Sequence, residues 1–301
     1  MIYIECKMRE IIRLFASAGE SRALNDKHNR LREDALCILH QLPEHLLLDN
    51  VYGKEWATLS MKWNQFLKTL CPHEYDGIEI KKIANRKKYD LDIRYKKNNQ
   101  VIYSVLGEFK HNEKKLTGLA QYFSPPEKKG YIATRYAEFF YDNYLDTLCE
   151  LVQIPKLDKE IYMKHVDQPN YSVHRFFDDL KKTESTHYKE KQKLVHKSIK
   201  DYLSQYANQL SLQAVTNDIL SQQDKTFILW DCNEFRSDKI HPDELQLESI
   251  EKVHRNNTIV VVSKAGTKHK MLLRWRNHLG VLYPAWQISL DRSARRSPTL
   301  S

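Results

Sequence analysis

Glycine, proline and cysteine are all scarce in this 301-residue chain, which has eight glycines, nine prolines and five cysteines. So little glycine and proline excludes the collagen-like and low-complexity classes of protein. The five cysteines are odd in number and widely separated, and they form no CxxC pair, which argues against a disulfide framework and a zinc ribbon. We therefore expect a protein of the reducing cytoplasm.

Long hydrophobic runs are also missing. The opening MIYIECKMRE lacks the apolar stretch of a signal peptide, and no run of about 18 apolar residues is present to span a membrane. We expect no membrane partner. The GxxxxGKS and GxGxxG fingerprints are absent, so nucleotide-driven motors and dinucleotide-dependent redox enzymes are unsupported. The thirteen histidines form no His/Asn/His series with the spacing of an HNH nuclease.

Positive charge is in excess. The chain has 48 lysines and arginines against 39 aspartates and glutamates, a formal net charge of +9. Such an excess suggests a polyanionic partner such as nucleic acid. Hydrophobic residues make up 41% of the chain, which is enough to build one large domain or two ordinary ones.

The hydrophobic periodicity predicts an α/β (α+β) fold. Apolar residues at helical spacing predict helices, and alternating residues predict strands. The expected elements are helices over residues 27–42 and 56–70, strands over 78–84, 88–95 and 101–110, and a helix over 113–124 that ends at Pro125-Pro126.

The chain is expected to divide into four parts. Residues 1–133 hold the N-terminal helices and the central hairpin, and residues 134–225 are mostly helical. Residues 226–290 are rich in β-strands that complete the core or contact a partner, and residues 291–301 form a polar, disordered tail. The run STHYKEKQKLVHKSIKDYL in the helical part predicts either a solvated helix face or a face that lies along a phosphate backbone.

The strand VIYSVLGEFK ends with two charged residues on one face. Side chains two positions apart on a strand share a face, so Glu108 and Lys110 lie together beyond a largely apolar strand. Charges in such a partly buried place must be paired, hydrogen-bonded or bound to metal. On the preceding strand Asp90 and Asp92 also share a face, and their carboxylates can join Glu108 in holding a hard divalent cation.

The register of the hairpin decides whether these groups meet. A simple two-residue turn at Asn98-Asn99 would pair Asp90 with Gly107 and leave Glu108 on the opposite face. An odd-numbered loop or a β-bulge would set Asp90 opposite Glu108 and Asp92 opposite Leu106. Both aspartates remain candidates. An alternative interpretation of the whole motif is a surface hairpin with an ordinary Glu–Lys pair.

Asp90 or Asp92 followed by Glu108-Phe109-Lys110 resembles the bipartite PD-(D/E)xK signature of the restriction-endonuclease-like nuclease superfamily. The 17 or 15 intervening residues fit that superfamily, although Lys88-Tyr89 stand where its proline is usual. The C-terminal LLRWRNHLGVLYPAWQIS is similar to segments of type II restriction endonucleases.

The resemblance implies a central mixed β-sheet flanked by helices and a Mg²⁺-dependent, sequence-specific double-strand DNA endonuclease. Asp90, Asp92 and Glu108 would bind Mg²⁺, which Mn²⁺ can replace, and Lys110 would orient or help deprotonate the attacking water. It also implies a homodimer, with a DNA methyltransferase as functional partner. Two alternatives stay open, a structure-specific repair or recombination nuclease and a non-catalytic DNA-binding module on the same fold.

The resemblance suggests two further residues. Glu33 on the first helix is a possible extra metal ligand, although its position away from the apolar stripe favours a solvated side chain. Gln121 would contact DNA from the helix expected after the motif, and an ordinary surface glutamine is the alternative.

The segment KHKMLLRWRNH predicts a strand with one basic and one largely apolar face. We expect Lys268 and Lys270 to contact DNA phosphates, and Arg274 or Arg276 to contact a guanine edge. Pro284, in the strand that follows, suggests a bulge or a sheet edge. The alternative interpretation is therefore a solvated edge strand whose lysines prevent aggregation.

Overall fold

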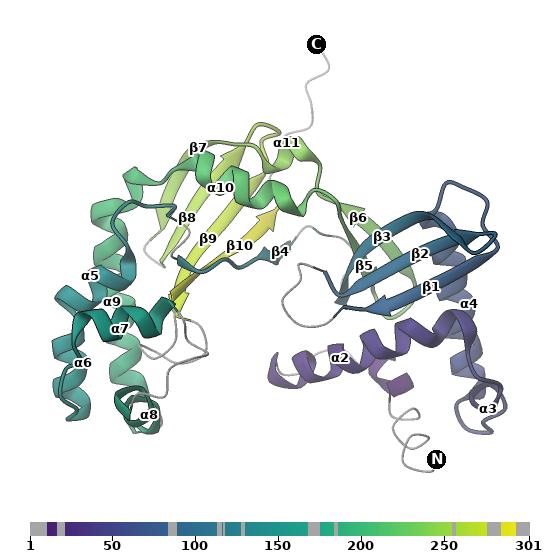
Figure 1. The fold of residues 1–301 in the computed structure, drawn as a ribbon, viewed down its shortest axis with the longest axis horizontal. Helices are drawn as coiled ribbons and strands as arrows, with labels where there is room; N and C mark the ends of the chain where they lie inside the picture. Colours follow the sequence, from purple (N-terminus) through teal and green to yellow (C-terminus); the bar gives the residue numbers. More distant parts are fainter. Residues whose placement is uncertain are drawn as a thin grey trace. The chain divides into compact units, whose positions relative to one another are not determined.

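The computed structural model describes residues 11–16, 22–83, 89–112, 116, 118–127, 130–167, 175–183, 186–254, 257–275 and 284–292. The chain forms two compact units. The first contains Met1–Leu116 and Gln222–Ile240, and the second contains Thr117–Ser221 and His241–Ser301. The predicted mixture of helices and strands is confirmed, and the fold belongs to the α+β class (Figure 1).

The first unit is built on a mixed five-stranded sheet in the order β1-β2-β3-β5-β6. Its strands are β1 (Gly77–Lys82), β2 (Leu91–Lys97), β3 (Gln100–His111), β5 (Lys225–Trp230) and β6 (Phe235–Lys239). Strands β3 and β5 are parallel and the other pairs are antiparallel. The connection between the two parallel strands contains residues 117–221 of the second unit, so β5 pairs with a strand more than a hundred residues away.

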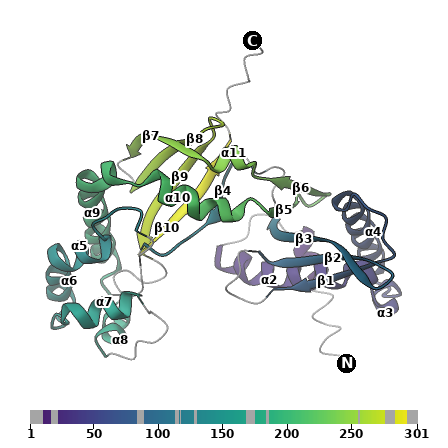
Figure 2. The same cartoon turned by 45° about the horizontal axis from the view of Figure 1, so that its top comes forward.

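One face of this sheet carries the core of the first unit. The helices α2 (Arg22–Ile38) and α4 (Gly53–Leu70) lie against the sheet (Figure 2), and the short η1 (Leu39–Gln41) and α3 (Glu44–Leu47) connect them in the chain. Leu91, Ile93 and Tyr95 of β2 and Val105 and Phe109 of β3 join the buried side chains of these helices in one hydrophobic cluster. Beyond the turn end of the hairpin, the even-numbered residues therefore occupy the other face, to which Glu108 and Lys110 belong.

Two of the predicted helices are confirmed. The helix expected over 27–42 corresponds to α2 and η1, and the one expected over 56–70 corresponds to α4. Helix α4 stops at Cys71, whose backbone is extended. Extended geometry is what the residue before a proline favours, and Pro72 follows.

The helix expected over 113–124 is wrong. Residues Gly118–Phe123 form strand β4, which pairs with β10 in the second unit. The sequence LAQYF is compatible with either structure, because it combines good helix formers with aromatic residues that suit a strand. The segment forms a strand because it pairs with β10, which lies far away in the chain.

The second unit contains an antiparallel sheet in the order β4-β10-β9-β8-β7. Its C-terminal strands are β7 (Leu247–His254), β8 (Thr258–Ser263), β9 (Lys268–Trp275) and β10 (Pro284–Asp291). The region expected to be mostly helical is confirmed as such. It holds α5 (Tyr136–Asn143), α6 (Leu145–Val152), α7 (Lys159–Asp167), α8 (Arg175–Lys182), α9 (Tyr188–Tyr206), η3 (Ala207–Gln209), α10 (Leu212–Ile219) and η4 (Leu220–Gln222), and the short α11 (Pro242–Leu245) follows β6.

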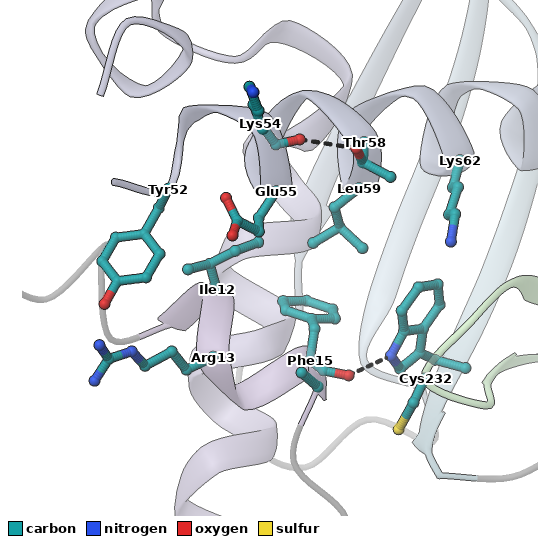
Figure 3. Close-up of a pocket in the computed structure, with 12 residues that line it drawn as sticks. Ile12, Arg13, Phe15, Tyr52, Lys54, Glu55, Thr58, Leu59, Lys62 and Cys232 are labelled. Atoms are coloured by element: carbon teal, nitrogen blue, oxygen red, sulfur yellow. Dashed lines mark hydrogen bonds between the residues drawn. The ribbon is translucent and has the colours of Figure 1, made fainter. Parts of the chain in front are cut away.

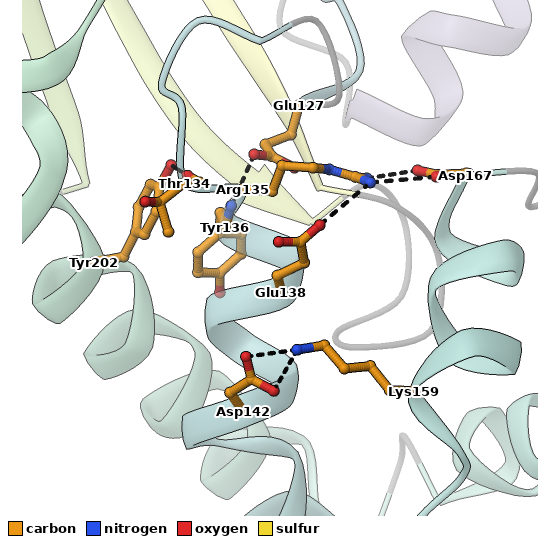
Figure 4. Close-up of polar contacts among 9 residues, drawn as sticks. All are labelled: Glu127, Thr134, Arg135, Tyr136, Glu138, Asp142, Lys159, Asp167 and Tyr202. Atoms are coloured by element: carbon orange, nitrogen blue, oxygen red, sulfur yellow. Dashed lines mark hydrogen bonds and ion pairs between the residues drawn. The ribbon is translucent and has the colours of Figure 1, made fainter.

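A buried polar network fixes the start of α5 in the second unit (Figure 4). The Glu127 carboxylate accepts a 2.8 Å hydrogen bond from the backbone amide of Tyr136. Arg135 lies 2.6 Å from Asp167 at the end of α7, and Tyr202 of α9 donates to the carbonyl of Thr134 at 2.6 Å. These contacts tie three helices to the segment that leads from β4.

Candidate functional site

The hairpin between β2 and β3 contains the β-bulge that the site requires. Asn98 and Asn99 both have positive φ angles, 52° and 64°, as a two-residue turn of the type favoured in hairpins demands. Lys97 pairs with Gln100 and Lys96 with Val101, but Tyr95 pairs with Tyr103. Ile102 is thus the extra residue, and it shifts the register by one position.

The shifted register brings Asp90 to Glu108. Asp92 lies opposite Leu106 and Leu91 opposite Gly107, so Asp90 at the next position faces Glu108. The Asp90 amide donates to the Gly107 carbonyl at 2.9 Å, which extends the ladder to this point. The turn has only two residues, which alone would pair Asp90 with Gly107. The β-bulge shifts the register by one residue, so Asp90 lies opposite Glu108.

Asp90 is held in a partly buried place beside a second carboxylate. Its Oδ2 atom accepts a 3.0 Å hydrogen bond from the backbone amide of Phe109. Burial and, after it, the negative charge of Glu108 raise the pKa of Asp90, while Lys110 and Lys225 oppose the rise. A carboxyl group whose pKa is raised beside a second carboxylate is in a setting that a bound cation would stabilise.

Glu108 contacts two lysine side chains. One is Lys110, two positions along the same strand, as the sequence predicted. The other is Lys225, the first residue of β5, whose side chain is only 5% exposed while that of Glu108 is 13% exposed. Burial lowers the pKa of Lys225, and the charge of Glu108 opposes that effect. The site therefore contains a second lysine.

Sequence reasoning missed Lys225. It precedes the apolar run TFILW, and all six residues of β5 are buried. A lysine that enters a wholly buried strand needs a partner for its charge, and this was the signal available. The partner could not be read from the sequence, because β5 pairs with β3 across 117 positions of the chain.

Asp92 takes part in a different interaction. Its carboxylate accepts hydrogen bonds from the guanidinium of Arg94 at 2.7 and 3.0 Å, and its position lies opposite Leu106. The structure thus brings Asp90, and not Asp92, together with Glu108 and Lys110. Both aspartates were candidates from the sequence.

Glu33 is closer to the site than its position on the helix suggested. The expectation of a solvated side chain is wrong, since this side chain is only 15% exposed and lies 3.3 Å from the ammonium of Lys82. Burial and the charge of Asp90 raise the pKa of Glu33 to about 7. A third carboxyl group therefore lies within electrostatic reach of the pair.

The carboxylates of the site are oxygen donors of the kind that hard cations bind. Across the described residues, no group of three or more histidine, cysteine, aspartate or glutamate side chains is arranged to hold a metal ion. Mg²⁺ needs fewer protein ligands than this, because it commonly binds through one or two carboxylates and keeps several waters or substrate phosphates. Asp90 and Glu108 supply oxygen donors of that kind, so the pair fits Mg²⁺.

The predicted DNA-contact residues lie in the second unit. Gln121 is on strand β4 and not on a helix, and Ser289 of β10 pairs with Gln121 on one side and with Lys270 on the other. Paired residues share a face, so Gln121 and Lys270 belong to the same face of the sheet. Arg276 lies outside the described residues.

The two-faced character of strand β9 is confirmed, and the alternative interpretation, an edge strand, is wrong. The odd positions from His269 to Trp275 are buried and the even positions are half-exposed. Strand β9 pairs with β8 and β10 and so lies inside the sheet, and Pro284 is tolerated because it begins its strand. Lys268 and Lys270 are ion-paired, with Glu251 at 2.6 Å and Asp291 at 3.1 Å.

A separate apolar pocket of approximately 500 Å³ lies in the first unit, between residues 11–16 and α4 (Figure 3). Phe15, Leu59 and Trp230 are among its lining residues, and the indole N–H of Trp230 donates to the carbonyl of Phe15 at 2.8 Å. Asp90 and Glu108 do not line this pocket. The carboxylate pair and the pocket are therefore distinct features of the unit.

No helix within the described ranges is both long and apolar enough to cross a membrane. No protein-family model, no curated protein and no solved structure matches this chain.

Proposed function

We propose that this protein is a Mg²⁺-dependent endonuclease that hydrolyses phosphodiester bonds in double-stranded DNA. The observation that carries the proposal is the meeting of Asp90, Glu108 and Lys110 at the end of one hairpin. These three residues represent both halves of the PD-(D/E)xK motif. They lie together because the β-bulge in β3 shifts the register of the hairpin by one residue.

Each group has a chemical role in this proposal. Asp90 and Glu108 would hold the cation, and Glu33 lies within electrostatic reach of Asp90. When bound, Mg²⁺ stabilises the charge that develops on the scissile phosphate and lowers the pKa of water. Lys110 orients the attacking water, and Lys225 holds the Glu108 carboxylate in position. Lys225 is thus a positioning residue.

The type II restriction activity, the homodimer and the DNA methyltransferase partner remain part of the proposal, supported by the resemblance of the motif and the C-terminal segment. A cytoplasmic location is proposed from the sparse, scattered cysteines. Gln121, Lys268, Lys270, Arg274 and Arg276 are proposed DNA contacts.

One observation favours a second candidate, a DNA-binding module without catalysis. Glu108 already contacts two ammonium groups, so a cation has to displace or share at least one of them. The second candidate therefore predicts DNA binding in the absence of any metal-dependent cleavage.

The test is cleavage of supercoiled plasmid in Mg²⁺, with EDTA as the metal-free condition. We expect the wild type to nick or linearise the plasmid in Mg²⁺ alone, and Glu108→Ala and Lys110→Ala each to abolish cleavage while DNA binding persists. Losing a preorganised electrostatic group commonly costs about 3–4 kcal/mol of transition-state stabilisation, or roughly 10²–10³ in rate.

Glu74 and Lys97 provide the matched control. They form a 3.3 Å ion pair in the same unit, but Glu74 is 92% exposed and far more accessible to water than Glu108. Glu74→Ala and Lys97→Ala should cleave at the wild-type rate. Near wild-type cleavage by Glu108→Ala or Lys110→Ala would refute the assignment, and discrete fragments from a complex DNA would distinguish restriction from branch-specific repair.

A further inference from the structure

We propose that the exposed face of helix α9 binds the phosphate backbone of duplex DNA. The inference deepens the proposed function, on which it rests for the identity of the partner. It assigns the main phosphate contacts to a helix of the second unit and not to strand β9.

Helix α9 separates its apolar and basic residues onto two faces. Val195, Ile199 and Tyr202 are buried, and the Tyr202 ring packs against Tyr136 of α5, which lies beside α9 in Figure 1 and Figure 2. The exposed residues include Lys189, Lys193, His196 and Lys200. Their spacing of four, three and four places them on one side of the helix.

The three lysines of this face are available to a partner. Within the described part of the chain, no carboxylate forms an ion pair with Lys189, Lys193 or Lys200. Two other lysines of α9 differ in this respect. Lys191 is buried and donates to the Leu180 carbonyl at 2.8 Å, and Lys197 is bound to Asp201 at 2.6 Å.

Strand β9 is less suited to bind phosphate. Lys268 and Lys270 already have carboxylate partners in Glu251 and Asp291, so a phosphate must displace a carboxylate to contact either of them. Among the described residues, Lys189, Lys193 and Lys200 have no ion-paired carboxylate that a phosphate would have to displace. Charge complementarity therefore favours α9 as the phosphate-binding surface.

The dimensions of the face suit a duplex. Lys200 lies eleven positions after Lys189, which is a rise of about 16.5 Å along the helix. Duplex DNA carries one negative charge per about 1.7 Å of its axis, so a duplex segment of this length carries roughly ten phosphate charges. Three lysine contacts would contribute about 2.7 to the slope of log binding constant against log salt concentration.

The experiment measures binding of a fluorescein-labelled 30-base-pair duplex by fluorescence anisotropy from 50 to 200 mM salt, in EDTA to prevent cleavage. The test variant is the full chain with Lys189→Gln, Lys193→Gln and Lys200→Gln together. We expect at least about tenfold weaker binding at 100 mM salt, and a salt slope reduced by roughly 2 to 3. A variant that binds within twofold of wild type with an unchanged slope overturns the proposal.

The matched control carries Lys164→Gln, Lys252→Gln and Lys264→Gln, which are exposed lysines of the same unit scattered over other elements. It loses the same charge, so an equal loss of affinity in the control overturns the proposal in favour of a net-charge effect. Preferential binding of wild type to vesicles with anionic lipid, abolished in the test variant while duplex binding stays intact, also overturns it.

The outcomes separate this inference from the proposed function. If the wild type cleaves DNA and the α9 variant binds as tightly, the surface is wrong and the nuclease stands. If the α9 variant binds weakly while no protein cleaves, the surface stands and the nuclease is wrong. If the wild type binds no duplex, both are wrong.

Discussion

The backbone amide of Phe109 donates a 3.0 Å hydrogen bond to the carboxylate of Asp90. Phe109 is the middle residue of the Glu-Phe-Lys triplet, so this contact fastens one half of the motif directly to the other. The Phe109 side chain belongs to the hydrophobic core on the opposite face of the sheet. The core thereby fixes the strand that presents both charged neighbours.

The contact predicts that Asp90 and Asp92 differ in importance. Asp90→Asn should lower single-turnover cleavage by about 10²-fold or more, because the amide cannot supply a charged metal ligand. Asp92→Asn should change the rate less than tenfold, since Asp92 is bound to Arg94 and lies opposite Leu106. An inactive Asp92→Asn and an active Asp90→Asn would reverse the assignment.

The metal requirement is the second prediction. A site of carboxylate oxygens should accept Mg²⁺ or Mn²⁺ for cleavage, and Ca²⁺ should support DNA binding without turnover because it is larger and less demanding in geometry. Metal titrations of plasmid cleavage, paired with binding measurements in Ca²⁺, test this. Full cleavage in excess chelator would rule out the metal mechanism.

The third prediction concerns Lys225. Its positive charge lowers the pKa of Asp90, so Lys225→Met should raise that pKa and move the acidic limb of the cleavage pH profile to higher pH. Lys225→Arg retains the charge and should leave the limb in place. A rate profile measured from pH 5 to 9 checks both variants. An unchanged limb in Lys225→Met would show that this lysine has only a structural role.

The fourth prediction concerns stability and pH in the second unit. Burial raises the pKa of Glu127 from its ordinary value of 4.5 to about 7, against the opposing effects of the Tyr136 amide and Arg135. A carboxyl group with a raised folded-state pKa contributes stability that is fully present below about pH 4.5 and is lost as the pH rises through about 7. The shift corresponds to a loss on the order of 3 kcal/mol in the free energy of unfolding.

Glu127→Gln is the variant that tests this. The glutamine keeps an oxygen to accept the Tyr136 amide but carries no charge. Urea unfolding at pH 5 and pH 8 should show the wild type losing stability relative to Glu127→Gln as the pH rises. A difference between the two proteins that is the same at both pH values would contradict the predicted titration.

The fifth prediction concerns strand β9. Because Lys268 and Lys270 are ion-paired, Lys268→Ala and Lys270→Ala should each weaken DNA binding less than the α9 substitutions. Arg274→Ala and Arg276→Ala should relax the preference at a single base, at a cost of about 1–3 kcal/mol for the residue that contacts guanine. Selection of binding sites from a random DNA library measures this preference. If both arginine variants keep the base preferences of the wild type, these arginines do not read the DNA sequence.

The sequence by itself determined the local elements of this protein. The apolar periodicity located α2 and α4, although both helices begin before their predicted starts, and the alternation in β9 correctly assigned a buried and a half-exposed face. Glu108 and Lys110 could be placed together because two positions along a strand always share a face. These features depend on neighbouring residues, and the chain carries that information directly.

The tertiary structure decided everything that depends on distant pairing. Residues 118–123 became a strand because β10 was available as a partner, and β9 lies inside its sheet because β8 and β10 pair with it on either side. Because of the bulge at Ile102, Asp90 and not Asp92 lies opposite Glu108. The parallel pairing of β3 with β5 places Lys225 in contact with Glu108. Such pairings depend on which surfaces remain to be buried once the local elements exist, and periodicity in a single sequence does not encode that choice.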